Sequence, residues 1–212
     1  MSGRFITLEG GEGAGKSTHA SRLAARLRGA GLEVVETREP GGTPGAEAIR
    51  ALLLGGGEAR WSPMVEALLL NAARADHAER LIVPALARGL WVVCDRWLDS
   101  TLAYQGGAGG LGLETLRALH AIATGGLMPR RTLLLDLPVA QGLARAGRRG
   151  GTADRIGGRD AGFHERVRAA FLALAAAEPE RIAIIDASAG EDRVAEAIWS
   201  VVEPLLGPDA GP

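Results

Sequence analysis

Several features are scarce in this 212-residue chain, and each scarcity argues against a class of protein. The single cysteine, Cys94, cannot form an internal disulfide, so we expect a reducing, cytoplasmic environment. No uninterrupted apolar run approaches the ~18 residues that span a bilayer. The N-terminus also lacks the basic start and apolar core of a secretion signal. We therefore expect no association with a membrane.

An excess of charge of either sign is also missing. The chain has 24 basic and 25 acidic residues, which give a net charge of -1 at pH 7. A broad basic surface for nucleic acid is therefore not expected. Lysine is nearly absent, because Lys16 is the only one among the basic residues. Codon bias explains a general preference for arginine, and a compact point charge at position 16 is modest evidence for a specific role there.

Hydrophobic residues make up 47% of the chain, which suffices for one buried core, and we expect a single domain over residues 1–212. Short apolar runs predict strands near 5–8, 33–37, 91–94, 132–135 and 182–185. The segments between them predict helices near 16–30, 45–54, 63–88 (kinked or split by Pro84), 113–124, 138–148, 162–178 and 192–206. The glycine-rich segments 106–112 and 147–158 are predicted to be mobile loops.

The order of these elements predicts the fold class. Strands that alternate with helices favour a parallel sheet with right-handed crossovers. Strands that are apolar throughout indicate that helices cover both faces of the sheet. We therefore predict a three-layer α/β fold around a central, five-stranded parallel sheet. In such sheets ligands bind beyond the carboxyl ends of the strands, so those ends are where chemistry is expected.

A phosphate-binding motif follows the first predicted strand. Residues 10–17 read GGEGAGKS and match G-x-x-x-x-G-K-[ST], between an apolar strand and a helix. Glycines let backbone N–H groups surround phosphate oxygens, and the helix N-terminus adds partial positive charge. In this reading Lys16 neutralises the β- and γ-phosphates of a nucleoside triphosphate, and the hydroxyl of Ser17 binds Mg²⁺. The alternative, an ordinary glycine-rich turn, is disfavoured by the motif and its context together.

Charged residues follow the second and third predicted strands. Asp95 ends the third strand, where a carboxylate can hold magnesium or its waters, although a helix N-cap is the alternative. Arg38 and Arg96 follow neighbouring strands. Each alone is typical of a surface ion pair, but two arginines at the phosphate edge favour phosphate binding. This P-loop NTPase reading thus gains a metal ligand and two candidate phosphate clamps.

Arginines gather around the second glycine-rich segment. They are Arg145, Arg148, Arg149, Arg155 and Arg159. One interpretation is a solvated basic loop. The other is a mobile, arginine-rich lid at about residues 147–160, which closes over the triphosphate and excludes water, because phosphoryl transfer needs positive charge on the migrating group.

From about Phe5 to Val202 the chain resembles thymidylate kinase. The most specific segments are 9–18, 37–43 and 95–105, which read EGGEGAGKST, TREPGGT and DRWLDSTLAYQ. The resemblance implies transfer of the γ-phosphoryl group of ATP to dTMP, giving dTDP and ADP for dTTP synthesis. It further implies Mg²⁺, a homodimer, and the bacterial subtype in which the lid supplies the catalytic arginine.

The resemblance also implies roles for individual residues. Glu12 looks like the carboxylate near the 3′-hydroxyl and phosphate of dTMP, and Arg96 like the clamp on that phosphate. Arg74 looks like the arginine that hydrogen-bonds a thymine carbonyl, and Tyr104 like the ring that crowds the 2′ position. Arg155 looks like the transition-state arginine. The other implied dTMP-binding residues are Arg38, Glu39, Pro40, Arg50, Leu70, Ser100 and the base readers Thr101 and Gln105.

The remaining implied positions belong to ATP, Mg²⁺ and catalysis. Catalysis would involve Lys16 and Asp95 besides Glu12, Arg96 and Arg155, with Ser17 and Asp95 at the metal. The segment 186–188 looks like the start of an adenine-binding loop. The implied ATP-binding residues are Gly10, Gly11, Glu12, Gly13, Ala14, Gly15, Lys16, Ser17, Thr18, Arg145 and Arg149.

The chain departs from the family pattern at one position. Leu70 stands four residues before Arg74, where the family usually places an aromatic ring on thymine. Aromatic stacking contributes ~1–3 kcal/mol per base in nucleic-acid binders. We therefore expect weaker or compensated dTMP binding. A single methyl group also discriminates weakly, so some activity with dUMP is expected.

Three other functions are compatible with parts of the sequence. The first is a kinase of the same fold that phosphorylates another nucleotide or a deoxynucleoside. The second is a GTP-binding switch, but its usual Asn-Lys-x-Asp motif is impossible because Lys16 is the only lysine. The third is a nucleotide-binding module without turnover. No general base is needed for a kinase, because the second pKa of an acceptor phosphate is ~6, and none of the four histidines follows a predicted strand.

Overall fold

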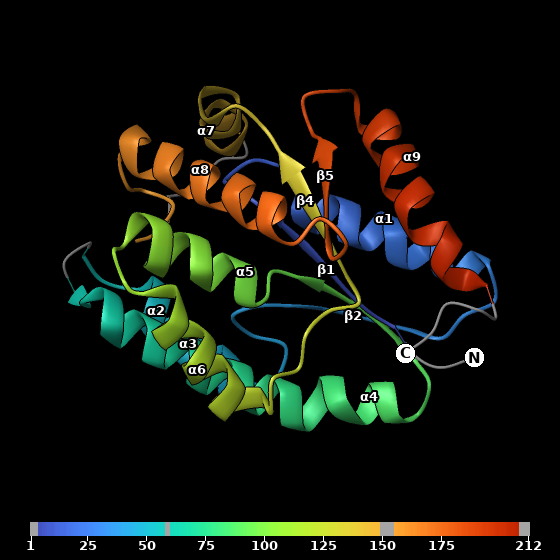
Figure 1. The fold of residues 1–212 in the computed structure, drawn as a ribbon, viewed down its shortest axis with the longest axis horizontal. Coiled ribbons are helices and arrows are strands. Elements are labelled where there is room, and N and C mark those ends of the chain that lie inside the picture. Colours follow the sequence, from blue (N-terminus) through green and yellow to red (C-terminus); the bar gives the residue numbers. More distant parts are fainter. Residues whose placement is uncertain (1–3, 58–59, 149–154, 208–212) are drawn as a thin grey trace.

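Five parallel strands form one sheet in the computed structural model, which describes residues 4–57, 60–148 and 155–207 (Figure 1). The sheet order is β2-β3-β1-β4-β5, and each neighbouring pair is parallel. The predicted strands are confirmed to within two residues. The strands are β1 (Phe5–Gly10), β2 (Val34–Arg38), β3 (Trp91–Asp95), β4 (Arg131–Asp136) and β5 (Ile182–Asp186).

One face of the sheet is covered by α1 (Lys16–Gly29), α9 (Glu191–Val202) and the short 3-10 segment η4 (Glu203–Leu206), which lie together on that side in Figure 1. Successive residues of a strand point to opposite faces, so the even-numbered residues of β1 pack here. The apolar cluster on this face contains Ile6, Leu8, Leu23, Leu27, Val93, Leu133, Leu135, Ile185 and Ile198.

A larger set of helices covers the opposite face. It includes α3 (Pro63–His77), α6 (Leu113–Thr124) and α8 (Ala161–Ala177), and the apolar cluster beneath them contains Phe5 and Trp97. Trp97 is fully buried, and its ring meets that of Phe5 edge-on at 5.1 Å. Two covered faces give the three-layer α/β architecture that the apolar strands predict.

Pro84 divides the long helix that the sequence predicts over residues 63–88. Helix α3 passes through a π-helical segment, η2 (Ala78–Ile82), into α4 (Val83–Ala87), and Pro84 lies in the first turn of α4. A proline has no N–H to donate and its ring clashes with the preceding turn. A local π-helical turn is one recognised way to relieve that conflict. Helices α2 (Pro44–Leu54) and α7 (Val139–Arg148) also belong to the described residues.

One prediction about a glycine-rich loop is wrong in part. Residues after β3 form a helical turn, α5 (Leu98–Thr101), followed by the π-helical segment η3 (Leu102–Ala108), which includes part of the predicted loop 106–112. A side chain at Gly107 would overlap the methyl group of Ala170 on α8. Gly107 therefore permits close packing of η3 against α8. Of the second glycine-rich segment, residues 149–154 lie outside the described residues.

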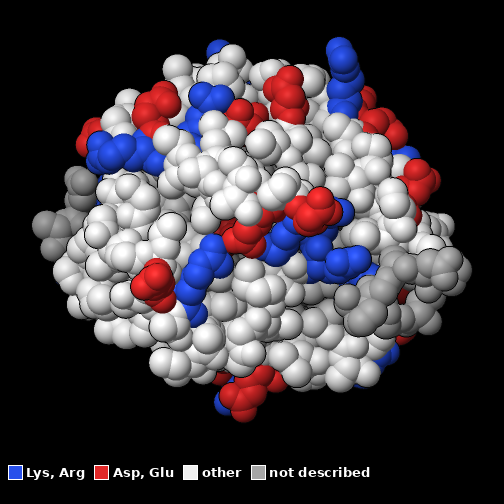
Figure 2. Space-filling view, viewed as in Figure 1, with Lys and Arg blue, Asp and Glu red and all other residues white. Residues whose placement is uncertain are grey.

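Acidic and basic side chains are intermixed on the face of the molecule seen in Figure 2, and neither sign forms a broad patch there. Exposed ion pairs bring opposite charges together on the surface: Arg22 on α1 pairs with Glu191 of α9 at 2.9 Å. Such exposed pairs contribute little stability individually. Among the described residues, no helix has the length and apolar character needed to cross a bilayer.

Candidate active site

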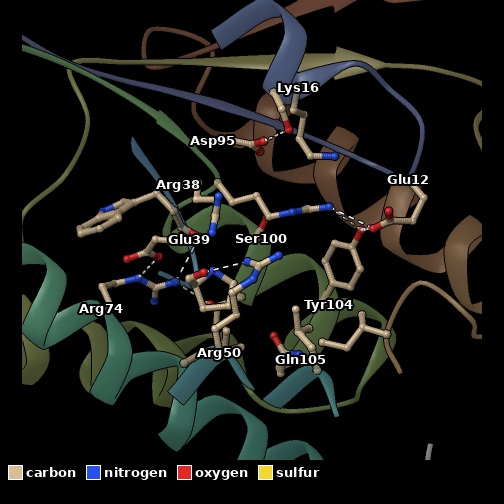
Figure 3. A pocket seen from close by; sticks show the side chains of 18 of the residues that line it. Glu12, Lys16, Arg38, Glu39, Arg50, Arg74, Asp95, Ser100, Tyr104 and Gln105 are labelled. Carbon is tan, nitrogen blue, oxygen red and sulfur yellow. Dashed lines mark hydrogen bonds and ion pairs between the residues drawn. The ribbon is translucent and has the colours of Figure 1, made fainter. Parts of the chain in front are cut away.

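A cavity of about 230 Å³ opens beside the carboxyl ends of β1, β2 and β3 (Figure 3). This is the edge at which the parallel sheet predicts ligand binding. The cavity gathers most residues to which the sequence assigns a role. Those that line it are Glu12, Gly13, Gly15, Lys16, Ser17, Arg38, Glu39, Pro40, Arg50, Leu70, Arg74, Asp95, Arg96, Ser100, Thr101, Tyr104 and Gln105.

The glycine-rich loop between β1 and α1 adopts a conformation that its sequence requires. Gly13 has a φ of 69°, and a side chain there would overlap the carbonyl of Gly142 on α7. Lys16 is the first residue of α1, and its Nζ donates to the carbonyl oxygen of Gly11 at 2.7 Å. Burial and, next, the guanidinium of Arg96 lower the pKa of Lys16 to about 8. The loop thus presents a buried cation whose charged form an incoming anion would stabilise.

The predicted metal ligands lie side by side. The hydroxyl of Ser17 donates to Oδ2 of Asp95 at 2.5 Å. The second oxygen, Oδ1, is buried and makes no hydrogen bond within the described residues. A buried carboxylate oxygen without a partner is unfavourable unless a ligand satisfies it, so this pair fits Mg²⁺. No cluster of three or more candidate metal ligands occurs in the described part of the chain, which suits an ion held largely by phosphates.

Arg96 reaches from the end of β3 across to the glycine-rich loop. Its Nη2 donates to Oε1 of Glu12 at 3.0 Å and its Nη1 to the hydroxyl of Ser100 at 3.0 Å. The hydroxyl of Tyr104 also donates to Oε1 of Glu12, at 3.2 Å. Burial alone would raise the pKa of Glu12, but Arg96 and Lys16 outweigh it and lower that pKa to about 2. The result is a fixed carboxylate beside a guanidinium at the mouth of the phosphate loop (Figure 3).

Arg74 projects from α3 into the far end of the cavity and is 2% exposed. Its Nε donates to Glu39 at 2.8 Å and its Nη2 to the hydroxyl of Thr101 at 2.9 Å. The other carboxylate oxygen of Glu39 lies 3.4 Å from Nδ1 of His77. Glu39, predicted to belong to the monophosphate pocket, therefore holds Arg74 in place. His77 is completely buried in this network, which agrees with a packing role rather than a helix-surface one.

Two further arginines line the cavity from the side of α2. Arg50 donates to the carbonyl oxygen of Pro40 at 2.7 Å, and this bond links α2 to the segment after β2. Arg38 pairs with Glu47 at 2.9 Å while it lines the cavity. Glu47 also accepts from the backbone N–H of Gly42 at 3.1 Å. These contacts preorganise the TREPGGT segment along one wall.

Comparison with known proteins identifies the family of this chain. The family model described as thymidylate kinase matches residues 8–198. The chain belongs to the thymidylate kinase family. The thymidylate kinase of Rhizorhabdus wittichii is 56% identical over 207 residues, which cover 97% of this chain and 100% of that protein. Those of Caulobacter vibrioides and Rhodopseudomonas palustris are 55% and 53% identical, and each alignment covers 97% of this chain and 98% or 91% of the relative.

Glu9 begins the segment 9–18 that carries the resemblance to thymidylate kinase, but the motif assigns it no role. It is completely buried in β1, and its Oε1 accepts from the backbone N–H of Trp97 at 2.7 Å. Its Oε2 accepts from the hydroxyl of Ser100 at 2.5 Å. Arg96, directly before Trp97, has a φ of 74°, which is unusual for a residue with a side chain. Glu9 therefore stabilises the turn that aims Arg96, and its signal in the sequence is a lone carboxylate within an apolar strand.

Arg155, predicted to be the transition-state arginine, does not line the cavity. Its side chain is buried, its Nη1 donates to Glu66 at 2.6 Å, and its Nε donates to the carbonyl oxygen of Leu53 at 2.9 Å. The sequence gives no hint of this pairing, because Glu66 lies 89 residues upstream. In this structure Arg155 anchors the C-terminal part of the predicted lid, and its catalytic role stays a prediction.

Some predicted ATP-binding residues also lie outside the cavity. Arg145 donates to the carbonyl oxygen of Ala187 at 3.0 Å and thereby links α7 to the segment predicted to begin the adenine-binding loop. Arg149 lies outside the described residues. The predicted ATP-binding residues that do not line the cavity are Gly10, Gly11, Ala14, Thr18 and Arg145.

Proposed function

We propose that this chain transfers the γ-phosphoryl group of ATP to dTMP, forming dTDP and ADP for dTTP synthesis. The observation that carries the proposal is one cavity that joins the phosphate loop at Lys16 to a second cationic group, Arg96. A single anion site would suit a nucleotide-binding switch. Two cationic groups in one enclosed space suit a donor and an acceptor that both carry phosphate.

The donor triphosphate binds at the loop. Backbone N–H groups and the N-terminus of α1 face its phosphates, and Lys16 neutralises the β- and γ-phosphate oxygens. Mg²⁺ binds near the hydroxyl of Ser17 and the unpartnered oxygen of Asp95. When bound, the ion supplies charge neutralisation for the transferred group. Arg145 and Arg149 complete the ATP-binding set.

The acceptor dTMP binds with its phosphate at Arg96 and its base at the end lined by Leu70 and Arg74. Arg96 is already fixed by Ser100 and Glu12, so it aligns the acceptor without reorganisation. Glu12 and Tyr104 lie beside the sugar, near its 3′-hydroxyl and its 2′ position. Thr101, which accepts from Arg74, and Gln105 face the base.

The chemical step needs alignment more than acid–base groups. A nonbridging oxygen of the dTMP phosphate attacks the γ-phosphorus of ATP, and the bond from that phosphorus to the β,γ-bridging oxygen breaks. The electron pair of the broken bond leaves with ADP. The attacking oxygen is already ionised at neutral pH, so no proton has to be removed. Lys16 and Arg96 oppose the charge that spreads over the transferred group, and a lid arginine adds to them.

A homodimer forms part of the proposal. Leu52 on α2 and Met64 and Leu68 on α3 are exposed apolar residues, with 46%, 37% and 49% of their surface accessible. Apolar side chains gathered on adjacent helices favour an interface between two proteins. Sedimentation analysis tests this point, and a monomer at assay concentrations would contradict it.

The central experiment is ADP release with Mg²⁺ and ATP across dTMP, dUMP, dCMP, dGMP and thymidine. We expect dTMP to be the best acceptor and dUMP to react measurably. Lys16→Ala serves as the inactive control in the same assay. A preference for thymidine or for another monophosphate would replace the proposal with the neighbouring kinase activity, and no turnover with any acceptor would reject it.

A further inference from the structure

Glu66 is a buried carboxylate beneath the base end of the cavity. It lies on α3 and is 1% exposed. Its Oε1 accepts from Arg155 at 2.6 Å and from Arg159 at 2.9 Å. Its Oε2 accepts from the side-chain amide of Gln105 at 2.9 Å. One carboxylate thus connects α3, the C-terminal part of the predicted lid, and η3.

The hydrogen bond to Glu66 determines which way the amide of Gln105 faces. A carboxylate held between two guanidinium groups offers only acceptor atoms, so the NH₂ group of Gln105 must turn toward it. Gln105 lines the cavity, and Figure 3 shows it pointing into that space from η3. Its carbonyl oxygen Oε1 makes no hydrogen bond to any described residue. Gln105 therefore presents its acceptor atom to the cavity.

An acceptor at this position matches one class of pyrimidine. Thymine and uracil carry an N–H at N3, which is a donor, whereas cytosine has an unprotonated acceptor nitrogen at N3. Opposed acceptors would leave two buried polar atoms without partners, and sites built for a hydrogen bond reject analogues that lack it strongly. If Gln105 were reversed, its NH₂ group would suit cytosine instead.

We propose that Glu66 is a positioning residue that fixes the amide orientation of Gln105, so that the cavity selects bases with an imide N–H. The proposal rests on the proposed function, since it assumes that the acceptor base occupies this end of the cavity. Glu66 does not line the cavity. Its influence passes through Gln105, while Arg155 and Arg159 hold it in the orientation that leaves Oε2 toward the amide.

The decisive measurement compares kcat/KM for dUMP and dCMP, which differ only at positions 3 and 4 of the base. In Glu66→Gln, residue 66 can donate as well as accept, so the amide of Gln105 is free to reverse. We expect the preference for dUMP over dCMP to fall about tenfold, corresponding to one hydrogen bond of typical strength. An unchanged preference in a folded Glu66→Gln variant would overturn the proposal.

Two further variants separate positioning from general damage. Arg159→Gln removes a partner of Oε1 and leaves the bond from Gln105 to Oε2, so it should preserve the base preference whatever it does to stability. Gln105→Met removes the amide, and adding Glu66→Gln to it should then change the preference no further. Equal losses of preference in the Arg159→Gln variant, or additive losses in the double variant, would contradict the proposal.

A measurement on the unaltered protein covers the case in which Glu66→Gln fails to fold. The chain has two glutamines, Gln105 and Gln141, and Gln141 is exposed on α7. In ¹⁵N-glutamine-labelled protein we expect the Gln105 side-chain amide to show slow exchange and one proton shifted downfield by the carboxylate. A Gln105 amide that behaves like that of Gln141 would overturn the proposal. If the unaltered protein phosphorylates no pyrimidine monophosphate, the proposed function fails first, and the two failures are thereby distinguished.

Discussion

At the end of the cavity proposed to bind phosphate, much of the lining comes from one continuous stretch of chain, the loop at residues 10–17. At the base end, single side chains from α2, α3 and η3 meet, and buried ion pairs such as that of Arg74 with Glu39 hold them. Backbone N–H groups recognise any phosphate of the right spacing, whereas side-chain networks recognise one base edge. Common chemistry therefore resides in a local motif, and specificity resides in contacts between distant parts of the chain.

The largest expected effect lies at the phosphate end. Lys16→Ala removes the buried cation that faces the phosphates, and we expect kcat/KM to fall about 10³-fold, as for the loss of one preorganised electrostatic group. Thermal unfolding should change little, because the substitution also removes a desolvated charge. Steady-state kinetics and calorimetry on the same preparation test both parts. A Lys16→Ala variant with near-normal activity would contradict the role given to the phosphate end of the cavity.

Arg155→Gln distinguishes an anchoring role from a catalytic one. The structure leads us to expect a loss of about 1.5–3 kcal/mol in the free energy of unfolding, because Glu66 would lose the charged hydrogen bond from Arg155 and keep the one from Arg159. The catalytic prediction instead expects a large fall in kcat with a small change in KM for dTMP. Urea unfolding and kinetics at a temperature where the variant is folded separate these outcomes. A stable variant with normal kcat would remove Arg155 from both roles.

Leu70→Phe tests whether the base end lacks stacking. Leu70 lines the cavity, and an aromatic ring there should stack on thymine and lower KM for dTMP about tenfold. The KM for ATP provides an internal control, since ATP binds at the other end and should be unaffected. Titration calorimetry with dTMP measures the affinity directly. Unchanged binding would indicate that another side chain already covers the base.

A smaller, pH-dependent effect is expected from Glu9, which supports the turn at Arg96. Burial, and next the charge of Asp99, raise the pKa of Glu9 to about 8. The folded state therefore holds a proton that the unfolded state releases near pH 4.5, so this group's contribution to stability falls as the pH rises through that interval. Glu9→Gln mimics the protonated form and should lose less stability than the unaltered protein between pH 5 and pH 9. Urea unfolding at those pH values measures the difference, expected to exceed about 1 kcal/mol, and parallel curves would contradict it.

The same division governs what the sequence reveals. The loop at residues 10–17 is contiguous and its glycines are required by backbone geometry, so its place after β1 follows from the motif. The strand positions are predicted equally well from the sequence, because short apolar runs between helical segments are typical of buried strands. Glu66 carries no local signal, although it shares one face of α3 with Leu70 and Arg74 at helical spacing. Its partners become apparent only when segments 89 residues apart pack together.

The glycines of η3 illustrate a different limit. Gly106 and Gly107 resemble a loop in composition, yet Gly106 is buried and Gly107 faces α8 at close range. The sequence alone does not distinguish a glycine that allows two helices to pack closely from a glycine that allows the backbone to turn. Only the neighbouring helix distinguishes the two uses, and that neighbour is remote along the chain.

The fastening of Arg74 has a consequence for the design of nucleotide analogues. Its guanidinium is tied to Glu39, Thr101 and the carbonyl oxygen of Trp97, and its face lies over the Trp97 ring. An analogue with a repositioned carbonyl group would meet an arginine that does not swing to follow it. Inhibitors aimed at the base end of the cavity should keep the hydrogen-bonding edge of the pyrimidine unchanged. Their substituents should instead vary toward Leu70, because an aliphatic side chain can change its conformation to accommodate them.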